Sequence, residues 1–144
     1  TSIVDAAFEE YTEACVLLGL VEKDQFAAPE EIGVPLISYV LGVSDVIGEL
    51  RRRTLDSLKG GDVDTSEKCL QLMESIYAEL IAMDDAYLLI PGLRRKCDVA
   101  RHLIETTRGE VAIETRRKSL ETAIRRLEKT IERKRKTKVE KTSQ

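Results

Sequence analysis

Residues 35–61, PLISYVLGVSDVIGELRRRTLDSLKGG, decide how this chain folds. Pro35 suits the first position of a helix. The N–H of a residue at that position forms no hydrogen bond within the helix, so proline loses nothing there by having no N–H. No further proline follows in this segment, and Gly60 with Gly61 provides a stop signal. The pattern predicts a helix over residues 35–59, long enough to be a principal helix of the core.

Helical periodicity continues on both sides of this segment. Residues 2–20 contain no proline and repeat apolar side chains at helical spacing, which predicts a first helix ending near Gly19. A third helix is expected from about residue 65 to 88, opened by a capping box of Asp64 and Glu67. Its apolar stripe has a helical period and comprises Cys69, Leu72, Met73, Ile76, Tyr77, Leu80 and Ile81.

A fourth helical segment follows Pro91 and Gly92. Its apolar face comprises Leu93, Cys97, Ala100, Ile104, Thr107 and Val111. Beyond Gly109 the register changes to alternating steps of four and three residues, typical of a coiled-coil seam that needs a partner helix from this chain or another. The seam comprises Ile113, Leu120, Ile124, Leu127 and Ile131, with Arg117 filling one step.

Composition supports an all-α protein. Of the 144 residues 42% are hydrophobic, 34% charged and only 4% aromatic, which indicates an aliphatic core built from helix stripes and argues against a sheet sandwich or barrel. Three scattered cysteines and one histidine, His102, give no support for a disulfide framework, a zinc site or histidine-based ribonuclease chemistry. No apolar run approaches the roughly 20 residues that cross a bilayer, and no leader opens the chain. A soluble, cytoplasmic protein without membrane contact is expected.

Charge divides the chain unevenly. Residues 1–49 hold ten acids and one lysine, whereas residues 116–144 hold twelve bases and four acids. An acidic region suits a cation and a basic tail suits a polyanion. We expect a helical domain over residues 1–110 and a basic, coiled-coil-like tail over residues 111–144. The alternative for the tail is a solvated helix end that frays into disorder.

Paired acids on the first two predicted helices are the main chemical signal. Glu10 and Glu13 are three residues apart, and Asp45 and Glu49 are four apart, so each pair projects from one helical face. Glu10, Glu13 and Asp45 have no Lys or Arg within one turn, and a buried unpaired carboxylate must be neutralised, paired or bound to a metal. We expect the two helices to pack side by side with these acids facing one another. Mutual repulsion would then make the loss of the Asp45 charge neutral or stabilising.

Oxygen ligands without histidine or thiolate select a hard divalent ion, Mg²⁺ or Mn²⁺. Such an ion suits phosphate chemistry, because it lowers the pKa of a bound water whose proton a carboxylate can accept. Solvated or interhelical salt bridges are the alternative interpretation of the acids. That alternative is strongest for Glu49, because Arg52 and Arg53 lie three and four residues away.

Three segments resemble the translin/Trax family. FEEYTEA at residues 8–14 resembles the Trax E-Y-x-E-A segment, which supplies two active-site glutamates. SYVLGVSDVIGELRRR at 38–53, followed by GGDVDT, is similar to the family's D-Y-L-x-G-V-x-D-x-x-G-E-L stretch and its G-D-[IV]-D-T turn. A weaker likeness continues through LRRKCDVARHLIETTRG to Gly109. Translin has an apolar residue at the position of Asp45, so this aspartate points to the catalytic Trax branch.

The resemblance implies an antiparallel helical bundle of the translin type with a long C-terminal helix. It also implies a Mg²⁺- or Mn²⁺-dependent endoribonuclease acting on single-stranded RNA, in which Glu10, Glu13 and Asp45 are the catalytic and metal-binding acids. Glu49 would be a further metal ligand and Arg52 a nucleic-acid contact. Family members assemble as octameric shells, so we expect a homo-oligomer or a translin-like partner subunit. The chain departs from the family pattern at its front, where further helices and basic contacts are expected.

Two other classes of function stay open. A translin-like protein would bind single-stranded RNA or DNA without catalysis, and it would need a basic groove, preferably with aromatic side chains on which bases stack. A helical scaffold would use the coiled-coil seam itself, and it would leave Glu10, Glu13 and Asp45 pointing to solvent.

Overall fold

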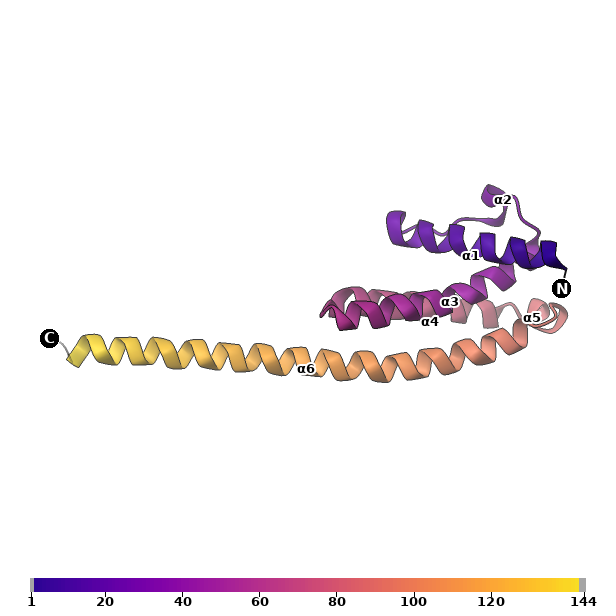
Figure 1. The fold of residues 1–144 in the computed structure, drawn as a ribbon. Coiled ribbons are helices and arrows are strands. Elements are labelled where there is room, and N and C mark those ends of the chain that lie inside the picture. The colour runs from indigo at the N-terminus through magenta and orange to yellow at the C-terminus, as the bar shows by residue number, and fades with distance from the viewer. Residues whose placement is uncertain (1, 143–144) are drawn as a thin grey trace. The chain divides into compact units, whose positions relative to one another are not determined.

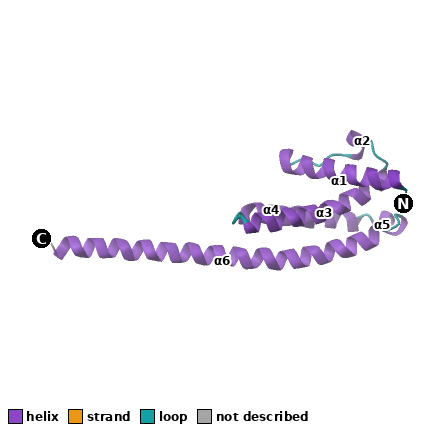
Figure 2. Cartoon of the chain, viewed as in Figure 1, coloured by secondary structure: helices purple, strands orange, loops and turns teal. Residues whose placement is uncertain are grey.

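A computed structural model describes residues 2–142, except for the side chains of residues 84, 86 and 87. Figures 1 and 2 show helices throughout the described residues, with no strand among them, which confirms the all-α prediction. The helices are α1 (Ile3–Lys23), α2 (Pro29–Ile32), α3 (Leu36–Lys59), α4 (Val63–Ala82), α5 (Asp84–Leu89) and α6 (Leu93–Thr142).

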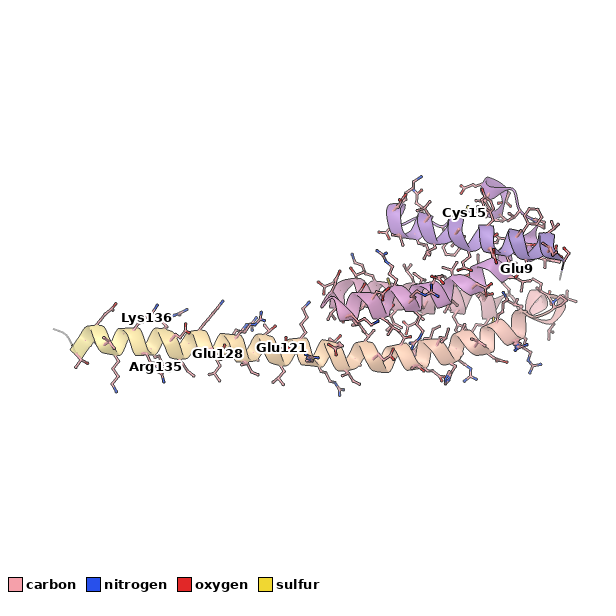
Figure 3. All side chains as sticks on the ribbon, viewed as in Figure 1. Glu9, Cys15, Glu121, Glu128, Arg135 and Lys136 are labelled. Carbon is pink, nitrogen blue, oxygen red and sulfur yellow. The ribbon has the colours of Figure 1, made fainter. Side chains whose placement is uncertain are left out.

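Contacts divide the chain into two compact units. Unit 1 comprises Thr1–Val111 and unit 2 comprises Ala112–Gln144, so α6 contributes to both. In unit 2 the side chains project from a single helix (Figure 3). Thr115 is partly exposed, and every side chain from Arg116 to Thr142 is exposed. The described tail is helical through Thr142, and residues 143–144 lie outside the described part of the chain.

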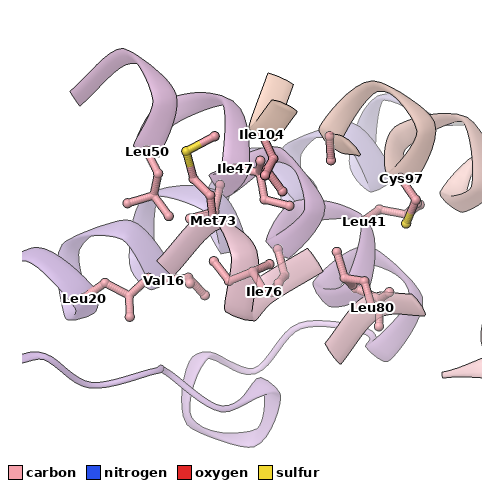
Figure 4. Close-up of a cluster of buried hydrophobic side chains, with 14 of the residues drawn as sticks. Val16, Leu20, Leu41, Ile47, Leu50, Met73, Ile76, Leu80, Cys97 and Ile104 are labelled. Atoms are coloured by element: carbon pink, nitrogen blue, oxygen red, sulfur yellow. The ribbon is translucent and has the colours of Figure 1, made fainter. Parts of the chain in front are cut away.

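The core of unit 1 is formed where α1, α3, α4 and the first part of α6 meet (Figure 4). α3 contributes most to it, because Val46, Ile47 and Leu50 are fully buried. α3 and α4 are joined by the short turn at Gly60 and Gly61 and run in opposite directions. All six residues predicted for the apolar face of the fourth segment are buried: Leu93, Cys97, Ala100, Ile104, Thr107 and Val111.

Several predicted helix ends differ from the structure. α1 continues past Gly19 to Lys23, because that glycine serves packing instead: a Cβ there would lie 2.7 Å from the carbonyl oxygen of Gln25. Pro35 is the N-cap of α3 instead of its first residue. These differences shift single helix ends and leave the order of the principal helices unchanged.

The third predicted helix is two helices. The N-cap of α4 is Asp62, whose side chain accepts a hydrogen bond of 3.0 Å from the Thr65 amide, so the predicted N-cap at Asp64 is wrong by two residues. α4 ends at Ala82, Met83 leaves helical geometry with ψ near 60°, and α5 follows. Cys69, Met73, Ile76 and Leu80 are buried, as the predicted stripe requires, whereas Ile81 is exposed. Gly109 does not interrupt α6, because a single glycine is tolerated inside a long helix.

The contact between α1 and α3 depends on a glycine. A Cβ at Gly42 would lie 2.6 Å from the carbonyl oxygen of Glu9 and 2.7 Å from Thr12 Cβ, distances too short for any side chain. Thr12 is fully buried at this contact. Gly48, two turns further along α3, has no atom within 4 Å of its Cβ position. The two glycines therefore differ in role although both are helical.

Gly42→Ala should lower the free energy of unfolding by about 1–3 kcal/mol, because the new methyl group forces α1 away from α3. Gly48→Ala is the matched control, and it should raise stability by up to about 1 kcal/mol through better helix propensity. Chemical denaturation followed by circular dichroism measures both. Equal effects of the two substitutions would show that close packing at Gly42 is not needed.

Candidate acidic site

α1 and α3 pack side by side, as predicted, and bring acids from both helices into one electrostatic group. Glu13 on α1 is partly buried. Its pKa is raised above the ordinary value, first by burial and then by the negative charges of Asp45, Glu49 and Glu10, whereas Lys96 lowers it. The three other acids singled out in the sequence therefore all act on the Glu13 carboxyl group.

Lys96 of α6 is the cation of this site. Its Nζ donates to Asp45 Oδ2 at 2.5 Å and to Glu9 Oε2 at 3.4 Å. Asp45 has no Lys or Arg within one turn of α3, but it has this cationic partner from α6, which is an interhelical ion pair of the kind that the alternative interpretation of the acids named. The predicted gain in stability on loss of the Asp45 charge also loses its basis, since that change removes an ion pair.

Glu9 belongs to the site and was missed in the sequence. Its side chain is only 14% exposed, and Figure 3 labels it on α1. The signal was its position three residues before Thr12 and seven before Val16, both fully buried, which puts Glu9 on the buried side of α1. No comparable local signal exists for Lys96, because its partners lie 51 and 87 residues away in the chain.

Glu10 occupies a different face from the one expected. Its side chain is exposed, and so are Ala6, Ala7 and Ala14, which were expected to form an apolar face around it. Alanine exposes too little apolar surface to decide which side of a helix is buried, whereas Val16 and Leu20 do decide it. Glu10 therefore affects Glu13 through its charge from the solvent side.

Glu49 and Arg52 form an ion pair on one turn of α3. Arg52 Nη2 lies 3.3 Å from Glu49 Oε1, and the arginine side chain is 73% exposed. Arg52, Arg53 and Leu17 line a depression of about 500 Å³. Arg51 contacts α6 instead: its Nη1 donates to Thr107 Oγ1 at 2.6 Å and to Glu110 Oε2 at 3.0 Å, which ties α3 to α6.

A second depression lies directly beside the acids. It has a volume of about 400 Å³, and Asp45, Lys96 and Arg95 line it together with Gly48. Since Gly48 carries no side chain, nothing from α3 covers Asp45 at that position. The rest of the lining is mainly apolar and includes Ile47, Val99 and Leu103, so charged groups meet at the edge of an open, largely apolar space.

The donor chemistry of the site fits a hard divalent ion, because its donors are carboxylate oxygens and the pKa of Glu13 is raised by burial and then by the neighbouring negative charges. The carboxylates, as they are placed in the structure, do not converge closely enough to form an ion site. Within residues 2–142 as described, no group of three or more Asp, Glu, His or Cys side chains is close enough to hold an ion. The ammonium of Lys96 holds Glu9 and Asp45 in place of an ion.

No helix in the described part of the chain is long and apolar enough to cross a membrane. The Translin family model matches residues 2–107. A protein of Methanocaldococcus jannaschii described as uncharacterized is 33% identical over 104 residues, which are 72% of this chain and 46% of that protein.

Two solved structures have the same fold as this chain. The crystal structure of apo-NeC3PO matches with a TM-score of 0.70 and 27% identity, over 76% of this chain and 57% of that one. AfC3PO in complex with duplex RNA matches with a TM-score of 0.70 and 31% identity, over 78% of this chain and 59% of that one. The chain thus spans about half the length of these relatives. On the family match over residues 2–107, supported by the shared helical bundle, the chain belongs to the translin family.

Proposed function

We propose that this chain belongs to the catalytic, Trax-like branch of the translin family and supplies the active site of a metal-dependent endoribonuclease for single-stranded RNA. The observation that carries the proposal is the convergence of Asp45, Glu49 and Glu10 on the partly buried Glu13, whose pKa is raised first by burial and then by their charges. A bound cation would relieve both the burial of this carboxyl group and the repulsion from its neighbours. The likeness to AfC3PO, solved with duplex RNA, supports RNA as the ligand.

Each residue has a role in this proposal. Glu10, Glu13, Asp45 and Glu49 would hold Mg²⁺ or Mn²⁺, which supplies a bound water of lowered pKa and a counter-charge for the phosphate. The raised pKa of Glu13 suits it to accept the proton of the attacking water, since a general base works best when its pKa approaches the working pH. Arg52, exposed beside Glu49, would contact a phosphate of the RNA.

Lys96 connects the resting and metal-bound states of the site. Its ammonium pairs with Asp45 and Glu9, so Asp45 would have to leave Lys96 before it could serve as a ligand of a divalent ion. Once released, Lys96 would lie beside the depression that it lines with Arg95, where both cations can hold a phosphate. The same side chain would thus keep the acids together before the ion binds and contact RNA afterwards.

The second candidate is an RNA-binding subunit without catalysis, which one observation favours. Asp45 is already neutralised by Lys96, and no three-ligand site is closed among the described residues. In that case the acids and Lys96 would stabilise the α1–α3–α6 contact, and binding would depend on cations such as Arg52. As in the translin family generally, an oligomer with identical subunits or a translin-like partner is part of both proposals.

Asp45→Asn should reduce cleavage of a labelled single-stranded RNA by about 100-fold or more while leaving RNA binding nearly intact, because the amide cannot replace a charged ligand of a hard ion. Glu49→Gln should do less, since Arg52 is its partner. Cleavage with Mg²⁺ or Mn²⁺ and binding by fluorescence anisotropy measure the two properties. Asp56→Asn, at an exposed position of the same helix, is the control. Full activity in Asp45→Asn, or in excess chelator, would favour the non-catalytic alternative.

Lys96→Met should tighten Mg²⁺ binding by about tenfold or more, because the ion no longer competes with an ammonium for Asp45. Isothermal titration calorimetry measures the dissociation constant without any dependence on cleavage. Lys96→Arg, which keeps the charge, is the matched control and should bind Mg²⁺ no more tightly than the unmodified chain. If Lys96→Met leaves Mg²⁺ affinity unchanged or weaker, the ion and the lysine do not share Asp45.

Glu13→Gln should stabilise the protein at pH 7 but not near pH 4. The pKa of Glu13 is raised above 4.5 in the folded state, so the native state binds more protons than the unfolded state between the two pKa values. Stability contributed by the neutral carboxyl is therefore lost as the pH rises through that interval. Thermal melting from pH 4 to 7 tests this, with Glu22→Gln at an exposed site of α1 as control. A stability difference that does not grow with pH would contradict the pKa assignment.

A further inference from the structure

Unit 2 carries an apolar seam on one side of α6. Ile113, Leu120, Ile124, Leu127 and Ile131 are each 45–66% exposed. A helix of this kind gains most of its stability from packing of its apolar stripe, so the seam needs a surface to cover it. In heptad notation Ile124 and Ile131 occupy a positions, and Leu120 and Leu127 occupy d positions. β-Branched residues at a with leucine at d favour a two-stranded parallel coiled coil.

The seam has defined ends. The a position before it is Glu110 and the next d position after it is Lys134, followed by Lys138 at a. Charged residues at these positions do not pack between helices, so pairing is limited to residues 113–131. The family match ends at residue 107, so the seam lies outside the part of the chain that the family model matches.

Arg117 is the one charged residue inside the seam, at an a position. Its Nη1 lies 3.6 Å from Glu114 Oε1 and its Nε lies 3.4 Å from Glu121 Oε1. Both glutamates occupy e positions at the edge of the seam, so the guanidinium is held there while the methylene groups lie over the seam. A single polar residue at an a position is a known means of fixing register at some cost in stability.

The charges beside the seam identify the orientation of a partner helix. In a parallel pair Arg116 at g meets Glu121 at e of the second copy, an attractive contact that occurs twice by symmetry. In an antiparallel pair with full seam overlap, Glu121 meets Glu121 and Glu114 meets Glu128, which are all repulsive contacts. Figure 3 labels Glu121 and Glu128 on unit 2, and Arg116 forms no ion pair within the described residues.

A membrane surface fits this helix less well than a second helix. Interfacial helices have bases next to the apolar face, where they reach anionic headgroups. Here the e positions directly beside the seam are acidic, at Glu114, Glu121 and Glu128, whereas the bases Arg125, Arg126, Lys129, Arg133 and Lys136 lie at b, c and f positions on the opposite side. The narrow a/d stripe and the acidic border indicate a protein partner.

We propose that residues 113–131 form a parallel, two-stranded coiled coil with the same residues of a second copy of this chain. The apolar seam is buried between the copies, Arg116 pairs with Glu121 of the partner copy, and the basic side of each helix faces outward. The surface is separate from the acidic site, so the pairing does not depend on nuclease activity.

Site-directed disulfide formation in the full chain tests the pairing and its direction. In a Cys15→Ser background, which removes the only cysteine that is not fully buried, Leu120→Cys and Leu127→Cys each place a thiol at a d position. In a parallel, in-register pair each forms a disulfide with its own counterpart, about tenfold or more faster than Thr122→Cys on the outward f position, because pairing raises the effective thiol concentration. Arg116→Glu should slow both cross-links.

Three results would overturn the proposal. The first is that neither d-position variant cross-links faster than Thr122→Cys although circular dichroism shows the helix intact. The second is that cross-linking occurs only in a mixture of Leu120→Cys and Ile124→Cys chains, which indicates antiparallel pairing. The third is that anionic phosphatidylserine vesicles bind the chain and suppress every cross-link, which indicates a membrane surface instead of a second copy.

Discussion

The close contact between α1 and α3 at Gly42 is the constraint on which the acidic site depends. Because Gly42 has no side chain, the backbone of Glu9 and the side chain of Thr12 reach the surface of α3 directly. Asp45 follows three residues later on the same helix, so the contact sets the distance at which acids from the two helices act on one another. A larger residue at that position would separate the helices and weaken that interaction.

Concentrating acids between two helices costs stability, and the third helix of the site offsets part of that cost. Lys96 reaches both Asp45 and Glu9 from α6, while Glu49 is paired with Arg52 on its own helix. Among the described residues Glu13 has no ion-pair partner of its own, and its pKa is raised first by burial and then by repulsion from the neighbouring acids. Perturbed pKa values are common where titratable groups serve chemistry, and structural ion-pair networks produce them too.

The two units of the chain have different relations to known proteins. Unit 1 contains the whole of the translin-family match and the acidic site, whereas unit 2 lies beyond that match and carries the coiled-coil seam. Assembly through unit 2 and chemistry in unit 1 would thus be properties of separate surfaces on one chain. Arg51, which ties α3 to Thr107 and Glu110 at the end of unit 1, belongs to the stable bundle and not to either surface.

The sequence by itself determined the helices and their buried faces, because periodic leucine, isoleucine and valine side chains make burial a local property: all six apolar-face residues from Leu93 to Val111 are buried. It also singled out Glu13 and Asp45, through a family resemblance and their lack of local partners. Helix ends such as Lys23 were less predictable, since they depend on contacts made by glycines. Only the tertiary structure decided that Lys96 pairs with Asp45 and Glu9 and that Glu10 faces solvent, because ion pairs between distant helices leave no trace in local spacing.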